Sequence, residues 1–505
     1  MCSDERSDRT VYFRERAAAA GLRLSEGEAE SLFGLAAWMS DGLAGPTRAA
    51  PDHAVLDLDI AELGARLRDG RLTSVALIEA TLQRIAERDA SYLAFYAVAS
   101  KQARLDAQKA DAELAEGQDR GPLHGIPVGI KDMIDVSGMA TTANAPGRRE
   151  AVATADAEVV RRLREAGAVV IGKLATYEWG TVGPDKRGLF PPAKNPWSLE
   201  HITGGSSSGC AVAVAGGLVR TTIGTDTGGS VRGPAFYCGV VGLKPTWGSV
   251  PKDGALTMSP SMDHVGPMSR TVAEAALTFD VIAGKNGEEA ATHLLGQPIA
   301  GLKIGYARNW FAHDPQVMPA VLAAMDAAAS KFSELGALID EIDLPDYPSI
   351  EIAAAAILHK ESFDFHAEAL REHPDAYGRR AFLSLAGGFA IDDAELSAAR
   401  QIGREFTASV NRVLDAHDVI ITVGALTTAL EAAPFEKEAV WTPMRTIGFN
   451  VSGHPVLAMP IGFHEGLPIG MQIIGRHYDE ARIIQVGHAF EQATDFSLQR
   501  PPTPS

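Results

Sequence analysis

Three short segments in the first half of the chain carry residue types that together could transfer an acyl group. Lys131 follows the run G-I, Ser206 stands in G-G-S-S-S-G, and Ser230 follows T-G-G. A serine hydroxyl attacks a carbonyl only when a base takes its proton, and the resulting oxyanion needs N–H donors. Glycines before Ser230 let the backbone turn several N–H groups inward. Lys131 could be the base if burial lowers its pKa from about 10.4 by several units.

Each segment by itself has a simpler interpretation. A lone G-G-S is most often a glycine turn, a lysine is usually solvated, and a glycine–serine run such as the one at Gly204 can cradle a phosphate. However, the sequence has neither a G-x-x-x-x-G-K-[ST] nor a G-x-G-x-x-G frame, so nucleotide binding is the weaker alternative. The three segments together favour a hydrolase site that works without histidine.

The elements that must position these residues alternate between helix and strand. Apolar residues at helical spacing predict helices over residues 74–88, 99–116, 156–166 and 480–492. Short apolar runs predict strands over residues 126–130, 168–171, 302–306, 418–423, 455–461 and 468–474. Valines and leucines interrupt the many glycines, serines and threonines of residues 204–260, which favours a folded core over a linker. The alternation predicts an α/β fold with helices on both faces of the sheet.

Composition narrows the classes of protein. The chain has 505 residues, of which 46% are hydrophobic, and a formal net charge of −18. A sizeable core is therefore expected, whereas nucleic acid and anionic membranes are disfavoured as partners. The cysteines, Cys2, Cys210 and Cys238, form no C-x-x-C pair, so we expect neither a disulfide framework nor a zinc site. Because we find no signal peptide and no apolar stretch of about 18 residues, we expect a cytoplasmic protein.

The first residues differ in texture from the rest of the chain. Residues 1–55 are expected to form a helical extension and a linker, with a capping box at Ser25 and Glu28. Residues 56–505 are expected to form the main domain. The helices of the extension could support a homodimer, which is a hypothesis.

The three segments and their surroundings resemble the amidase signature family. The likeness runs from about residue 57 to residue 501 and is strongest over residues 204–245, where the signature itself lies. It includes H-G-I-P-V-G-I-K-D, S-M-D-H-V-G-P-M, F-N-V-S-G-H-P-V-L-A-M-P and G-L-P-I-G-M-Q-I-I-G. Residues 285–440 match only loosely, so this variable region is expected to build the substrate pocket.

The resemblance implies a fold and a role for each reactive residue. The fold would be a large mixed, mostly parallel twisted sheet with helices on both faces. Ser230 would be the nucleophile, Ser206 the bridging serine after a cis peptide bond, and Lys131 the neutral base. The oxyanion hole would consist of Thr227, Gly228, Gly229 and the Ser230 amide. Amides would be the leading substrates, carbamates and esters stay open, and no cofactor or metal would be needed.

Neighbouring residues have supporting or lining roles in this interpretation. Gly205 precedes the bridging serine, Ser207 is expected to bond the loop backbone, and Asp226 and Arg232 are expected to form an ion pair. Cys238 is expected to be a small core residue. The candidate pocket residues, which core packing would explain equally well, are Met133, Tyr177, Trp179, Trp441 and Phe449.

Two other functions stay open at this point. The chain could be the A-type component of a tRNA-dependent amidotransferase, which carries the same signature and works with two partners. The N-terminal extension and residues 261–268 favour a stand-alone amidase over that component. A non-catalytic binding protein is disfavoured because all three reactive positions hold competent residues. His359, His366 and His373 recur every seven residues without clustered carboxylates, so a metal site is disfavoured.

Overall fold

The computed structural model describes residues 53–503. The helical extension expected over residues 1–55 lies almost entirely outside the described residues, as does its capping box at Ser25 and Glu28, so both stay predictions. In the described part, no helix is long and apolar enough to cross a lipid bilayer.

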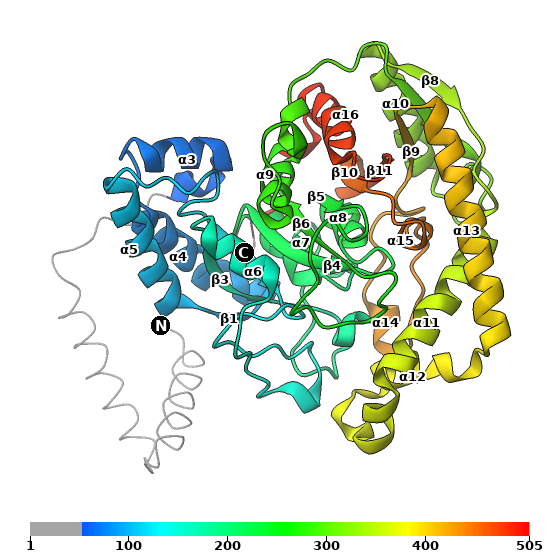
Figure 1. The fold of residues 1–505 in the computed structure, drawn as a ribbon, viewed down its shortest axis with the longest axis horizontal. Helices are drawn as coiled ribbons and strands as arrows, with labels where there is room; N and C mark the ends of the chain where they lie inside the picture. Colours follow the sequence, from blue (N-terminus) through cyan, green and yellow to red (C-terminus); the bar gives the residue numbers. More distant parts are fainter. Residues whose placement is uncertain (1–52, 504–505) are drawn as a thin grey trace. The chain divides into compact units, whose positions relative to one another are not determined.

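The core of the protein is one sheet of 11 strands (Figure 1). The strands run in the spatial order β1-β3-β2-β4-β6-β5-β10-β11-β9-β7-β8. Their bounds are β1 Phe95–Val98, β2 Pro127–Lys131, β3 Val169–Leu174, β4 Thr221–Asp226, β5 Val241–Lys244, β6 His264–Ser269, β7 Lys303–Tyr306, β8 Leu338–Glu341, β9 Val419–Val423, β10 Val456–His464 and β11 Leu467–Ile474. The expected large mixed sheet is confirmed, and each of the six predicted strands is present.

The balance of strand directions differs from the expectation of a mostly parallel sheet. Parallel pairs join β2 to β3 and β4, and β7 to β8 and β9. All the other pairs are antiparallel, including those between β4, β6, β5, β10, β11 and β9. The physical reason is connection length: parallel neighbours need a long crossover, whereas antiparallel neighbours can be joined by a tight turn. Between β10 and β11 only Glu465 and Gly466 make that turn, both with positive φ, at 50° and 79°.

Helices cover the sheet and build the variable region. Their bounds are α3 Ile60–Arg68, α4 Ser74–Tyr92, α5 Ser100–Ala115, α6 Glu158–Glu165, α7 Ser208–Ala215, α8 Arg232–Cys238, α9 Val272–Ala283, α10 Pro319–Glu334, α11 Tyr347–Glu372, α12 Arg379–Ala386, α13 Asp393–Ala416, α14 Ala433–Lys437, α15 Gly448–Val451 and α16 Glu480–Gln492. The long helices α11 and α13 pack side by side at the edge of the molecule (Figure 1).

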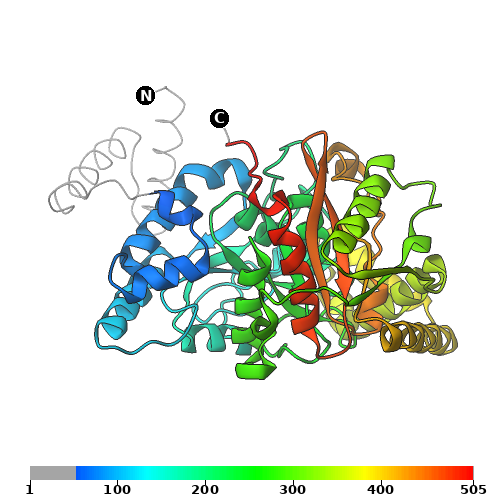
Figure 2. The ribbon, with the colours of Figure 1, turned by 90° about the horizontal axis from the view of Figure 1, so that it is seen from above.

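Alternation along the strands divides the core between the two faces of the sheet. In β3, Val169 and Ile171 pack with α7 and α8, whereas Val170 packs in the cluster that contains α9, α10 and α16. This period of two is the pattern of a strand buried on both faces. The helices therefore lie on both faces, as expected, and Figure 2 shows the sheet between them.

Two of the central strands and two buried helices bring the reactive segments together. Strands β2 and β4 are parallel neighbours with Ile130 opposite Ile223, so Lys131 and the end of β4 lie at the same edge of the sheet. Helix α7 begins directly after Ser207, and α8 begins at Arg232, just past the glycine turn. Every residue of both helices is buried, which holds the two loops rigidly against the sheet.

Candidate active site

Lys131 lies at the centre of the candidate site, with its side chain fully buried. Its Nζ is 2.8 Å from Ser206 Oγ and 2.7 Å from Thr225 Oγ1. Burial lowers the pKa of the Lys131 amine from 10.5 to about 7, because the charged form loses its hydration, and the negative groups near it offset only part of this shift. Near neutral pH the amine is therefore available in its uncharged form.

Thr225 is a part of this arrangement that sequence reasoning missed. Its hydroxyl and its carbonyl oxygen, at 3.5 Å, both face Lys131 Nζ, so the amine is held from the β4 side as well as by Ser206. The residue stands in the motif G-T-D-T-G-G-S, directly before Asp226. Only its place at the end of a strand that neighbours β2 could have indicated this contact.

The loop that carries Ser206 is tightly constrained. The peptide bond between Gly205 and Ser206 is cis, as the resemblance implied. A Cβ atom at Gly205 would lie 2.1 Å from Tyr177 Cε2, so no larger residue fits beside that ring. Ser207 donates to the carbonyl oxygen of Thr225 at 3.0 Å, which is the backbone bond expected for it. These contacts fix the Ser206 hydroxyl against Lys131.

Ser230 is half-buried at the wall of a cavity, directly before α8. Its carbonyl oxygen accepts a hydrogen bond from the Ser207 N–H at 3.2 Å, which ties the two serine loops together through the backbone. Within residues 53–503, the Ser230 hydroxyl forms no hydrogen bond, and so none with Ser206. The structure therefore holds the Lys131–Ser206 contact formed and the Ser230 hydroxyl free to turn toward a ligand.

The glycine turn before Ser230 separates one N–H group from the others. Gly229 donates its N–H to Asp226 Oδ1 at 2.9 Å. In the part of the chain that the structure describes, the N–H groups of Thr227, Gly228 and Ser230 have no backbone or side-chain acceptor. The expected set of four donors is thus corrected to three, because the Gly229 N–H is already engaged. Gly229 is instead needed for its φ of +127°, and a Cβ there would lie 2.4 Å from Thr446 Oγ1.

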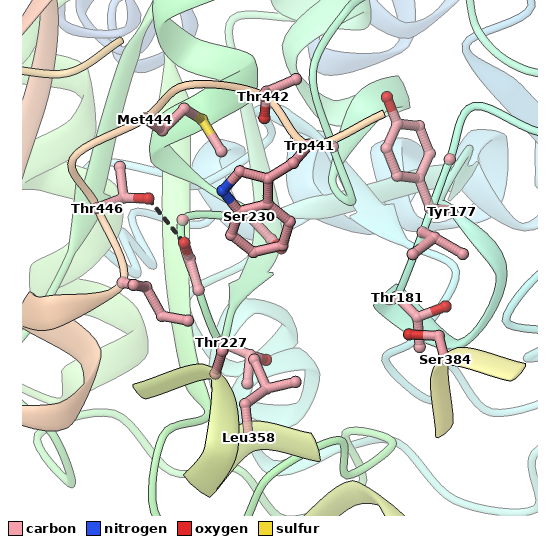
Figure 3. A pocket seen from close by; sticks show the side chains of 18 of the residues that line it. Tyr177, Thr181, Thr227, Ser230, Leu358, Ser384, Trp441, Thr442, Met444 and Thr446 are labelled. Atoms are coloured by element: carbon pink, nitrogen blue, oxygen red, sulfur yellow. Dashed lines mark hydrogen bonds between the residues drawn. The ribbon is translucent and has the colours of Figure 1, made fainter. Parts of the chain in front are cut away.

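Thr446 supports the same turn from the opposite side. Its hydroxyl donates to the carbonyl oxygen of Gly228 at 2.7 Å, which is the dashed contact in Figure 3. With Asp226 bonded to one side of the turn and Thr446 to the other, the backbone N–H groups keep one orientation.

Asp226 and Arg232 form the expected ion pair, 2.9 Å apart and fully buried. Burial by itself raises the pKa of the Asp226 carboxyl, but the Arg232 guanidinium and the Asn450 amide outweigh burial and hold the pKa well below its usual range. Asn450 Nδ2 donates to Asp226 Oδ1 at 2.8 Å, and Arg232 donates to Gln472 Oε1 at 3.0 Å. Sequence reasoning missed both amides, although each stands in a family motif of the C-terminal region.

A cavity of about 250 Å³ opens in front of Ser230. Figure 3 shows Tyr177, Thr181 and Ser384 on one side of it and the serine turn on the other. Its charged lining residue is Glu351, which accepts from Trp441 Nε1 at 3.0 Å and whose pKa burial raises above 4.5. The remaining side chains that define its chemistry are Met258, Tyr347, Leu358, His359, Val440, Met444 and Ile447.

The five candidate pocket residues have different locations. Tyr177 and Trp441 line the cavity in front of Ser230, and Met133 lines an adjoining cavity behind Ser206. Trp179 does not line either cavity, because its ring stacks on Tyr377 with centroids 5.6 Å apart. The expectation for Phe449 is corrected as well.

Phe449 is fully buried and packs against Trp310 and Phe406, with centroid distances of 5.4 and 5.8 Å. An aromatic side chain in a variable region can fill either a core or a pocket, and at this position the core takes it.

The histidines that could suggest metal binding are dispersed. His359 lines the cavity, whereas His366 packs edge-on against Trp179 and His373 caps the end of α11. Over residues 53–503, no group of three or more His, Cys, Asp or Glu side chains could hold a metal ion. Cys238 is buried in the core, as expected.

The fold and this site define a member of a known enzyme family. The chain belongs to the Amidase family, whose model matches residues 76–484. One relative is the A-type component of the glutamyl-tRNA(Gln) amidotransferase of Lysinibacillus sphaericus (strain C3-41). The two proteins are 34% identical over 483 residues, covering 87% of this chain and 97% of that protein.

Two solved structures illustrate the range of its relatives. The peptide amidase of Stenotrophomonas maltophilia superposes with a TM-score of 0.76 at 30% identity, covering 88% of this chain and 98% of the other. The A-type component of the glutamyl-tRNA(Gln) amidotransferase of Thermotoga maritima superposes with a TM-score of 0.72 at 28% identity, covering 89% and 99%. The family thus contains both hydrolases and amidotransferase components that resemble this chain.

Proposed function

We propose that this protein cleaves the C–N bond of an amide through an acyl-enzyme on Ser230. The observation that supports this proposal most strongly is the buried Lys131 amine 2.8 Å from Ser206, next to the loop of a half-buried serine in a cavity. An uncharged lysine can accept a proton, and a serine hydroxyl between base and nucleophile can pass one on.

The reaction has two halves. Lys131 takes the proton of Ser206 as Ser206 takes that of Ser230, and Ser230 Oγ forms a bond to the carbonyl carbon. The tetrahedral intermediate then breaks its C–N bond, and the leaving amine receives the proton from Lys131 through Ser206. In the second half, water attacks the acyl ester by the same relay, which releases the carboxylic acid and restores Ser230.

The oxyanion would be held by the N–H groups of Thr227, Gly228 and Ser230. These donors have no acceptor within the described chain, and Asp226 and Thr446 keep their turn in place. Preorganised donors of this kind contribute about 3–4 kcal/mol each to the transition state.

The charges of the cavity favour an uncharged acyl group. Among the described residues that line it there is no lysine or arginine, and the charged side chain is the Glu351 carboxyl. A substrate with a carboxylate would meet no cation and would be repelled by Glu351. We therefore place a neutral amide first, an aryl amide or a carbamate included, with esters as substrates of the same chemistry.

The A-type component of a glutamyl-tRNA(Gln) amidotransferase is the second candidate. The relative at 34% identity carries that name, so by sequence the comparisons support this candidate better than a stand-alone amidase. Glutamine, its expected amide donor, carries a carboxylate, and the charges of the cavity argue against it. Glutamine hydrolysis and copurification with two other proteins would establish the second candidate.

Two experiments test the proposal. In the first, Ser230→Ala is compared with the wild-type protein across anilides, primary amides, carbamates, esters and glutamine. We expect the variant to lose nearly all turnover of every substrate while its circular dichroism and melting temperature stay unchanged. Retention of more than a few per cent of activity would contradict the assignment of Ser230.

The second experiment detects the acyl-enzyme itself. A fluorophosphonate should label the wild-type protein at Ser230, and intact-mass spectrometry should show one adduct. The absence of labelling in a folded protein would favour a non-catalytic binding protein on the same scaffold.

A further inference from the structure

A second cavity, of about 190 Å³, lies where β4 begins and α7 ends. It is separate from the cavity in front of Ser230, and the two share no lining residue. The last described residues of the chain close it on one side, and Figure 2 shows this end of the chain near the helices that follow residue 53. Five arginines line it: Arg84, Arg88, Arg220, Arg270 and Arg500.

The carboxylates around this cavity balance only part of its positive charge. Arg84 pairs with Asp57 at 3.5 Å, and Arg220 pairs with Glu274 at 2.7 Å. Within the described residues, Arg88, Arg270 and Arg500 have no carboxylate at ion-pair distance. A local excess of positive charge is notable in a chain whose formal net charge is −18, because it runs against the field of the rest of the surface.

Arg270 carries the argument furthest, because it is buried and only partly bonded. Its side chain is 3% exposed and donates from Nη2 to the carbonyl oxygen of Gln499. Its Nε and Nη1 have no hydrogen-bond partner within residues 53–503. Burial, followed by the charges of Arg500 and Arg220, lowers the pKa of Arg270 to about 9. A guanidinium in this position is costly unless an anion pairs with it.

The nearest remaining carboxyl group does not supply that anion. Glu491 accepts the N–H of Val272 at 3.1 Å, and burial raises its pKa to about 8, so at neutral pH it is mostly uncharged. The three arginines without a carboxylate therefore face the cavity with no internal counter-charge.

We propose that this cavity binds a small phosphate-class oxyanion, either inorganic phosphate or the phosphoryl group of a small phosphomonoester. Guanidinium groups match the geometry of phosphate oxygens and bond them in pairs. The volume is smaller than that of most drug-sized sites, which agrees with a small ligand. The bound oxyanion would supply the acceptors that Arg270 lacks and neutralise the repulsion among Arg270, Arg500 and Arg220.

The position of the cavity connects it to the proposed active site through two rigid elements. Helix α7 starts beside the Ser206 loop and ends at the cavity, and β4 starts at the cavity and ends at Asp226. The ligand would therefore brace the far ends of the two elements that hold the reactive residues.

Isothermal titration calorimetry of the full chain with inorganic phosphate, at fixed ionic strength, tests this inference. We expect one site per chain for the wild type and binding at least tenfold weaker for Arg270→Gln and for Arg500→Gln. A matched control is Arg404→Gln, since Arg404 also lacks a carboxylate partner in the described chain but lies on α13. This control should bind phosphate like the wild type.

Glycerol 3-phosphate provides a second arm. Tighter binding than inorganic phosphate would identify a phosphomonoester as the ligand, and equal or weaker binding would identify free phosphate. If Arg270→Gln does not fold, Arg500→Gln and Arg88→Gln, which change more exposed residues, carry the test. Absence of phosphate binding to the wild type at millimolar concentrations, or equal binding by folded cavity variants, would overturn the inference.

Discussion

Lys131 Nζ and Ser206 Oγ lie 2.8 Å apart although 75 residues separate them in the chain. The contact forms because β2 and β4 are parallel neighbours and α7 returns the chain to the same edge of the sheet. Neither residue could hold this position from its own segment alone.

The first prediction concerns pH. Burial lowers the pKa of Lys131 to about 7, so the neutral base is present above that pH and is lost as the pH falls below it. We expect log kcat/KM to rise through this range and to fall by about one unit per pH unit below it. A rate that stays constant two pH units below that pKa would argue against a lysine base.

The second prediction concerns the contact that the sequence did not indicate. Thr225→Val keeps the shape of the side chain but removes the hydroxyl 2.7 Å from Lys131 Nζ. We expect kcat to fall by about tenfold with little change in KM, because a buried polar contact of this kind contributes about 1–2 kcal/mol. Thr225→Ser keeps the hydroxyl and should retain most of the activity. Equal activity of Thr225→Val and the wild type would remove Thr225 from the site.

The third prediction concerns the ion pair beneath the turn. Arg232→Met leaves the buried Asp226 without its cation, and we expect the free energy of unfolding to fall by about 3–5 kcal/mol. Urea denaturation measures this loss. The exposed pair Arg187–Asp185, at 3.0 Å, is the matched control, and Arg187→Met should cost less than about 1 kcal/mol. Similar losses in both variants would show that burial of the pair is unimportant.

The fourth prediction concerns the glycine turn. Gly229→Ala adds a Cβ 2.4 Å from Thr446 Oγ1 at a φ of +127°, so the turn must move. We expect kcat to fall by about a hundredfold, the loss typical when one oxyanion donor is misplaced. Gly301→Ala is the control, because its φ is also positive, at +84°, but its surroundings are open. A fully active Gly229→Ala protein would exclude this turn as the oxyanion site.

Several structural elements could be predicted from local patterns. The apolar run before Lys131 is a strand, and the pattern over residues 480–492 is α16 with the same bounds. Both were predictable because hydrophobic periodicity is a property of neighbouring residues.

The direction of the strands was not predictable in this way. The periodicity of residues 455–461 and 468–474 indicates two strands, but only their pairing through the two-residue turn makes them antiparallel. For the same reason, Trp179 and Phe449 could not be assigned to core or pocket, since both environments accept an aromatic ring.

The sequence by itself determined which chemical groups are present: a lysine, two serines and a glycine turn, in segments characteristic of the Amidase family. Only the tertiary structure decided that Thr225 joins Lys131, that the Gly229 N–H is engaged by Asp226, and that five arginines meet around one cavity. The physical reason is that residue type and spacing encode local conformation and reactivity, whereas pKa, hydrogen-bond partners and cavities depend on contacts between distant parts of the chain.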